Sequence, residues 1–84
     1  MYSYRIYQVA DGEWAIRRSV WGVFEVQYFC DSSANYSAGW RDDRVGRWSD
    51  KGSALRALRH ALAITGVPLS EWRKIEAKVC ADIG

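Results

Sequence analysis

Histidine and cysteine are scarce in this chain of 84 residues, which has one histidine, His60, and two cysteines, Cys30 and Cys80. A tetrahedral zinc site made of cysteine and histidine alone requires more ligands than this, so the sequence excludes such a site. The two cysteines are far apart in the chain and are expected to be free thiols, since a reducing compartment disfavours a disulfide. We predict no metal ion and no cofactor.

Long apolar runs and a strong net charge are also missing. No segment approaches the roughly 18 apolar residues of a transmembrane helix. The first residues, Met1-Tyr2-Ser3-Tyr4-Arg5, lack the basic-then-apolar order of a signal peptide. We therefore expect a cytoplasmic protein with no membrane partner. The net charge is +2, and so weak a field does not by itself indicate a nucleic-acid partner.

Apolar and aromatic residues are plentiful, at 49% and 14% of the chain. This composition is typical of a folded protein, and the length predicts a single domain over residues 1–84. Nine of the twelve basic residues are arginines, and the chain also has five tryptophans and five tyrosines. Arginine, tryptophan and tyrosine dominate the energetics of protein interfaces, so the composition favours a binding role.

The first thirty residues are patterned as an antiparallel meander. Alternation predicts a strand over Tyr2–Val9 and a second over Glu13–Val20, and the intervening Asp11-Gly12 is typical of a type I′ hairpin turn. Trp21-Gly22 offers a second tight turn. The third strand is then expected over Val23–Cys30.

The hydrophobic period changes from two to 3.6 after Trp48. Apolar residues recur on one stripe over Ser49–Thr65, which predicts an amphipathic helix. Ser49 or Asp50 is placed to cap its first turn, and Gly66 is placed to end it.

A second, shorter helix is expected near the C-terminus, with Ser70 as its N-cap. One face of this helix is expected to be apolar and to carry Trp72, Ile75, Val79 and Ile83.

The segment Asp31–Asp43 is small, polar and turn-prone. Loops of this length in a small domain are often functional. Asp42 and Asp43 are expected to pair with the flanking arginines rather than to bind a divalent ion. A short fourth strand is expected over Arg44–Trp48.

The predicted fold is therefore α+β: a small antiparallel sheet of three to four strands in a meander, packed on one long helix, plus a short C-terminal helix. Such a sheet leaves one face open to solvent. The face toward the helix is expected to carry Trp14, Ile16, Phe24, Val26 and Tyr28. The open face is expected to carry Arg5, Tyr7, Arg17, Glu25 and Gln27.

No catalytic constellation is present in the sequence. His60 lies outside the apolar stripe of the long helix and is expected to face solvent, and no sequence feature brings a cysteine to it. Gly46 and Gly52 lack the following Gly-Lys-Ser/Thr of a phosphate-binding loop. We predict that the chain is not an enzyme.

In size and architecture the chain resembles small phage and mobile-element accessory proteins of the anti-CRISPR type. This resemblance implies an inhibitor that occupies the surface of a larger host protein or nucleoprotein complex. The arginine-rich and aromatic composition suits an acidic protein surface. The expected partner-binding patch joins the open sheet face to the loop and consists of Arg5, Tyr7, Arg17, Tyr36, Trp40, Arg41 and Arg44.

A second resemblance is to AP2-type and integrase arm-type DNA-binding domains. It depends on Trp14-Ala15-Ile16-Arg17 and on Gly46-Arg47-Trp48 running into an alanine-rich helix. It implies a sheet in the major groove, and the contact residues it nominates are Arg5, Trp14, Arg17 and Arg18. Acidic residues near the sheet disfavour this alternative, because phosphate contacts supply most of the affinity for DNA. These acids are Glu13, Glu25, Asp42 and Asp43.

Overall fold

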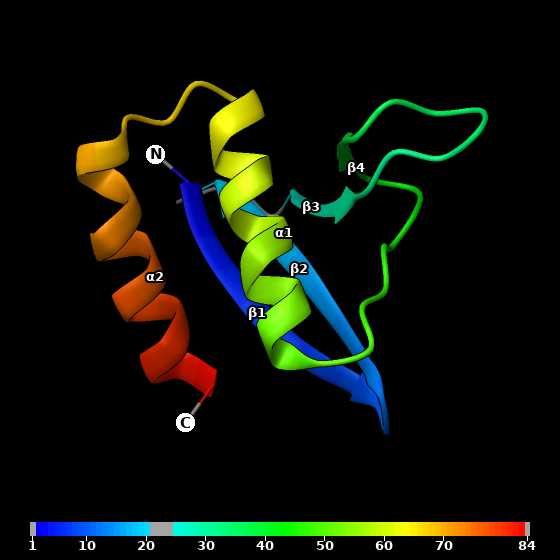
Figure 1. The fold of residues 1–84 in the computed structure, drawn as a ribbon, viewed down its shortest axis with the longest axis horizontal. Helices are drawn as coiled ribbons and strands as arrows, with labels where there is room; N and C mark the ends of the chain where they lie inside the picture. Colours follow the sequence, from blue (N-terminus) through cyan, green and yellow to red (C-terminus); the bar gives the residue numbers. More distant parts are fainter. Residues whose placement is uncertain (1, 21–24, 84) are drawn as a thin grey trace.

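The structure is a computed structural model that describes residues 2–20 and 25–83. It contains a four-stranded antiparallel sheet in the order β1-β2-β3-β4 and two helices. The elements are β1 (Tyr2–Ala10), β2 (Glu13–Val20), β3 (Val26–Cys30), β4 (Gly39–Arg41), α1 (Lys51–Ile64) and α2 (Leu69–Ile83). Both helices cover the same face of the sheet, with α1 crossing β1 and β2 and α2 lying beside α1 along β1 (Figure 1). The predicted α+β meander is confirmed.

The turn between β1 and β2 lies at Asp11-Gly12, as predicted, but it is not of type I′. Gly12 has a positive φ of 69°, whereas Asp11 does not, and a type I′ turn requires positive φ at both positions. The strand register shifts between Gln8 and Ala10 to accommodate this turn.

Strand β3 faces the opposite way from the prediction. Phe29 is fully buried in the core, while Tyr28 pairs with Arg17 and so shares the open face with it. Gln27 pairs with Arg18 on the helix side, where Arg18 Nε donates a hydrogen bond of 2.8 Å to Gln27 Oε1. The predicted positions of Val26, Tyr28 and Gln27 are therefore wrong, because Phe29 fills the core. The predicted Trp21-Gly22 turn and Phe24 lie outside the described residues.

The fourth strand also differs from the prediction. β4 lies within the expected loop, and its Trp40 pairs with Phe29, with the two rings 5.4 Å apart. The predicted strand over Arg44–Trp48 is wrong: Trp48 instead exchanges two backbone hydrogen bonds with Trp14, of 2.8 and 2.9 Å. Residues 44–48 therefore return to the hairpin end of β2, where β3 does not pair with it.

Helix α1 has the expected ends. The Asp50 side chain caps it by accepting a hydrogen bond of 2.7 Å from the Ser53 amide. At the other end Gly66 has a φ of 77°, and the Val67 amide donates to the Leu62 carbonyl at 3.0 Å. The left-handed conformation of Gly66 allows the Val67 amide to bond back into the last turn. Carbonyl groups at the helix end that would otherwise have no partner are satisfied in this way.

Helix α2 begins at Leu69, two residues before the first helical position that an N-cap at Ser70 implies. Ser70 lies inside the helix and is not its N-cap. The helix has 15 residues against 14 in α1, so the expectation of a shorter helix is wrong. Its predicted apolar face is confirmed: Val79 is buried, and the other members pack against the core, namely Trp72, Ile75 and Ile83. No helix among residues 2–20 and 25–83 is long and apolar enough to cross a membrane.

Candidate binding face

The side of the sheet that no helix covers is basic and aromatic. Alternation and register assign to this open face Ser3, Arg5, Tyr7, Ala15, Arg17, Ser19, Val26, Tyr28 and Arg41. Glu13, at the hairpin end of β2, is acidic and lies on the same side of the strand as Ala15 and Arg17. Glu25 lies just before β3 and is not part of the face.

Four side chains form one continuous row across all four strands. Arg5 pairs with Arg17, Arg17 with Tyr28, and Tyr28 with Arg41. Neighbouring strands lie roughly 4.8 Å apart, so the row extends over about 14 Å. We call it the Arg-Tyr row.

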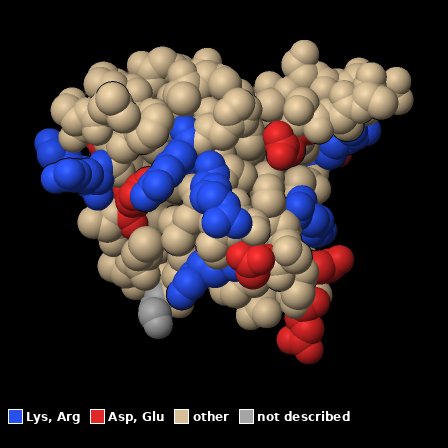
Figure 2. All heavy atoms as spheres, in the orientation of Figure 1, with Lys and Arg blue, Asp and Glu red and all other residues tan. Residues whose placement is uncertain are grey.

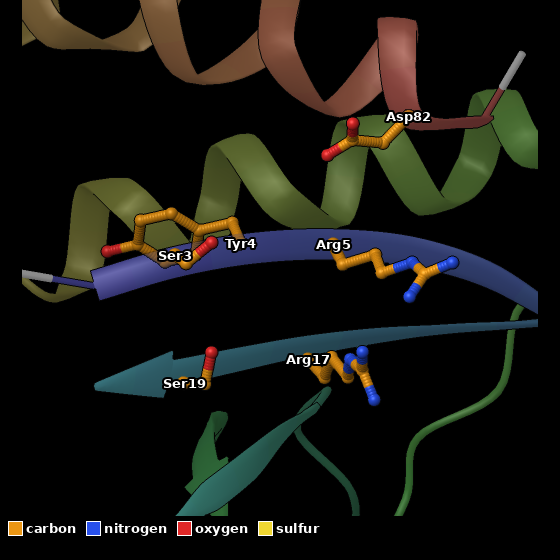
Figure 3. Close-up of a pocket in the computed structure, with 6 residues that line it drawn as sticks. All are labelled: Ser3, Tyr4, Arg5, Arg17, Ser19 and Asp82. Atoms are coloured by element: carbon orange, nitrogen blue, oxygen red, sulfur yellow. The ribbon is translucent and has the colours of Figure 1, made fainter. Parts of the chain in front are cut away.

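The β1 end of the row lies in a pocket of about 380 Å³. Figure 3 shows Arg5 and Arg17 side by side on neighbouring strands, with Ser3 and Ser19 opposite each other further along. The pocket therefore combines the guanidinium groups of Arg5 and Arg17 with the hydroxyl groups of the two serines, which can all donate hydrogen bonds, and Tyr4 also lines it. Asp82 from α2 lines the same pocket at the edge beyond β1.

Tyr7 lies against the middle of the open face. The Arg17 guanidinium carbon is 5.6 Å from the centre of the Tyr7 ring. Burial, and then the neighbouring Tyr28, raise the pKa of Tyr7, while the positive charges of Arg17 and Arg47 oppose this rise. Arg47 therefore adds a further positive charge close to the row.

The arginines of the row have no carboxylate partner among the described residues. Within 4.0 Å, the ion pairs of that part of the chain are Arg59–Glu76 and Lys74–Glu71, and both lie on the helices. Figure 2, which views the helical side, shows basic and acidic side chains interspersed there. On the open face, by contrast, Glu13 at the hairpin end and Asp82 at the pocket edge form no ion pair with the arginines of the row within 4.0 Å.

The expected pairing of Asp42 and Asp43 with their flanking arginines is absent from the ion pairs of residues 25–83. Arg41 instead donates from Nη2 to the Ser37 carbonyl at 3.1 Å, and the Arg44 guanidinium lies 4.0 Å from the centre of the Tyr36 ring. These contacts tie the loop to the β4 edge of the open face.

Trp40 does not belong to the open face, although we expected it in the partner-binding patch. Its ring contacts Phe29 and lies 5.9 Å from that of Tyr4, on the helix side. Arg18 lies 4.6 Å above the Trp40 ring. The predicted patch, which joined the open sheet face to the loop, is therefore wrong in its tryptophan.

The contact set implied by the AP2-type resemblance is divided between the two faces. Arg5 and Arg17 lie on the open face, whereas Arg18 stacks on Tyr2 and Trp40 on the other side. Trp14 packs against the hydrophobic core. A single DNA surface cannot contact all four of these side chains on this sheet.

Sequence reasoning missed Tyr28, Ser3, Ser19 and Arg47. Tyr28 was placed on the wrong face because it alternates with the apolar Phe24 and Val26, while the opposite phase carries the polar Glu25 and Gln27. The hairpin turn alone would not have paired the serines, since a two-residue turn at Asp11-Gly12 places Ser3 opposite Val20. The register shift between Gln8 and Ala10 brings Ser3 opposite Ser19.

The groups that could support catalysis lie elsewhere and apart. His60 is exposed on α1, as expected. Both cysteines are free, as expected; Cys30 is buried and Cys80 is exposed. Burial raises the pKa of the Cys30 thiol, against the effect of Arg44 and Arg41. Among the described residues, no group of three or more histidine, cysteine or acidic side chains could hold a metal ion.

No family model, curated protein or solved structure matches this chain. The geometry of the open face is therefore the basis for assigning a function.

Proposed function

We propose that this chain is a non-enzymatic binding module that docks the open face of its sheet onto an anionic surface of a larger macromolecule. The observation that carries the proposal is the Arg-Tyr row. Like charges directly opposite each other in a sheet are destabilising. An anionic partner would neutralise Arg5 and Arg17 together, so binding would relieve a repulsion that the fold alone retains.

The rigidity and composition of the face support the same role. A sheet surface is already ordered, so docking through it costs less conformational entropy than ordering a free loop. Arginine and tyrosine are the residues that most often dominate interfaces. A guanidinium group also matches carboxylate and phosphate oxygens with two parallel hydrogen bonds.

A small inhibitor of the anti-CRISPR type is the biological role that this geometry supports best. Such a protein would cover a functional surface of a host protein or nucleoprotein complex in the cytoplasm, through an anionic region of that target. One rigid binding face on a domain of 84 residues is sufficient for this, because inhibition by occupancy requires no chemistry of its own.

The proposal is tested by capture from a lysate of the cells that encode the protein. The wild type is compared with the double charge reversal Arg17→Glu/Arg41→Glu. The matched control is Arg73→Glu/Lys78→Glu, which makes the same change of charge at exposed positions of α2. We expect the wild type and the control to retain the same partner and the open-face variant to lose it. Equal retention by all three proteins, with folding verified by circular dichroism, would refute docking through the open face.

A further inference from the structure

We infer that the anion bound by the open face is the backbone of a single-stranded nucleic acid, lying across the strands along the Arg-Tyr row. This inference depends on the proposed docking role of that face and names the chemistry of its partner. It begins from the alignment of Arg5, Arg17, Tyr28 and Arg41 in one line across four strands.

The pocket at the β1 end suits a phosphate group. Two guanidinium groups and the Ser3 and Ser19 hydroxyls line it together with Tyr4 and Asp82, and the guanidinium and hydroxyl groups can donate hydrogen bonds to phosphate oxygens. Phosphate oxygens commonly accept hydrogen bonds from arginine and serine side chains at once. The pocket therefore matches one phosphate of a longer chain.

Beyond the pocket, the row offers a further positive charge for a phosphate and an aromatic ring for a nucleic-acid base. Arg41 provides positive charge at the far end, and Tyr28 lies between Arg17 and Arg41. Proteins that bind single strands combine a basic path for the backbone with aromatic side chains on which bases stack. Tyr7, which lies beside Arg17 and Tyr28, offers a second aromatic surface.

The charged groups at the two ends of the row differ, and they indicate at which end the bound single strand stops. Asp82 lines the pocket beyond β1 and would repel a further phosphate there. Beyond β4, Arg44 and Tyr36 stack together, and Arg41 is bonded to the same loop. The single strand is therefore expected to have one end near Arg5 and to continue past β4 toward the loop.

A duplex fits this face less well than a single strand. The bases of a duplex are stacked on each other, so the rings of Tyr28 and Tyr7 cannot stack on them without opening the helix. The contact residues implied by major-groove binding are also divided between the two faces of the sheet. Single strands leave both the phosphates and the base faces accessible.

The experiment measures fluorescence anisotropy with labelled probes: dT12, U12, a 12-base-pair duplex and poly-L-glutamate. We expect the single strands to bind more tightly than the duplex. If Arg5, Arg17 and Arg41 each neutralise one phosphate, the plot of log affinity against log salt has a slope of about −2, which is about a twentyfold loss between 50 and 200 mM salt. In Arg5→Ala/Arg17→Ala the slope falls to about −0.7, and in Arg73→Ala/Lys78→Ala it is unchanged.

Tyr28 separates base stacking from simple charge attraction. Tyr28→Leu should weaken binding of the single strands by at least about fivefold, whereas Tyr28→Phe keeps a ring and should bind like the wild type. Thermal denaturation of each variant verifies that it is folded.

Three outcomes would overturn the inference. One is equal affinity for the duplex and the single strands. The second is an equal effect of Tyr28→Leu and Tyr28→Phe. The third is binding of poly-L-glutamate but of no oligonucleotide, lost in Arg5→Ala/Arg17→Ala. That last result would leave the docking role intact and identify an acidic protein surface as the partner, whereas loss of the role itself is detected by the lysate capture.

Discussion

Arg5 and Arg17 lie directly opposite each other on β1 and β2, on the face of the sheet that no helix covers (Figure 3). Their Cβ atoms are expected to be about 5 Å apart, a separation at which opposite charges stabilise a sheet and like charges destabilise it. Neither side chain has a carboxylate within 4.0 Å among the described residues. Functional sites commonly retain such locally unfavourable arrangements, and this is why we assign the proposed binding role to the open face.

Replacing Arg17 with an acid should therefore stabilise the domain while removing its function. Arg17→Glu converts the repulsion with Arg5 into an attraction across the strands, and we expect the free energy of unfolding to rise by about 0.2–1 kcal/mol. Urea denaturation at low salt measures this change, and at high salt the gain should shrink because exposed charges are screened. A loss of stability at low salt would show that Arg17 contributes to the fold through contacts other than its charge.

The main elements of this fold could be predicted because their signals are local. Alternation in β1 and β2, the cap at Asp50 and the left-handed Gly66 each depend on a few neighbouring residues. The open-face positions of Arg5, Tyr7 and Arg17 followed from the same alternation, whereas their role in binding stays a prediction.

The errors arose where non-local pairing decides the structure. Val26, Tyr28 and Phe29 are all apolar, so the sequence of β3 does not determine which of them enters the core. The pairing of Arg17 with Tyr28 fixes that choice. β4 has three residues, too few for a recognisable period, and it forms because Trp40 packs on Phe29. The row that defines the candidate site could not be seen before these two registers were known.

Core packing beneath α1 predicts a large effect at Leu58 and a small one at Leu69. Leu58 is fully buried, so Leu58→Ala should reduce the free energy of unfolding by about 2–5 kcal/mol, from lost burial and the cavity left behind. Leu69 is 73% exposed at the start of α2, and Leu69→Ala should change stability by less than about 0.5 kcal/mol. Urea denaturation of the two variants side by side tests this contrast, and similar losses in both would mean that the phase of α1 is misassigned.

The cap of α1 predicts a specific loss of stability in acid. The hydrogen bond from the Ser53 amide holds the pKa of Asp50 below its ordinary value of 3.8. A carboxyl group with a lowered pKa in the folded state stabilises the fold above its unfolded pKa, and this contribution disappears as the pH falls through the folded pKa. Thermal midpoints measured from pH 6 to pH 2 should therefore fall less steeply below about pH 4 in Asp50→Asn, which caps without titrating. Parallel curves for the wild type and the variant would show that this carboxylate does not couple to folding.

Among the glycines of the described chain, Gly46 in residues 44–48 approaches the backbone of β3 most closely. A Cβ atom there would collide with the Phe29 carbonyl oxygen and would lie 3.0 Å from Trp48 Cη2 and 3.2 Å from Cys30 Cα. Because the first of these contacts is with backbone, the chain must shift, and Gly46→Ala should cost about 1–3 kcal/mol of stability. The shift would also displace the segment that carries Arg47 past Tyr7, so binding by the folded fraction should weaken.

Gly39 provides the matched control for this prediction. A Cβ atom at Gly39 meets nothing within 4 Å, although the residue lies in β4 beside the same binding face. Gly39→Ala should therefore leave stability within about 0.5 kcal/mol of the wild type and leave partner binding unchanged. Urea denaturation and the anisotropy titrations with dT12 measure the two effects separately. If Gly46→Ala were as stable as Gly39→Ala, the close approach of Gly46 to β3 would be wrong, and this packing would not hold Arg47 near Tyr7.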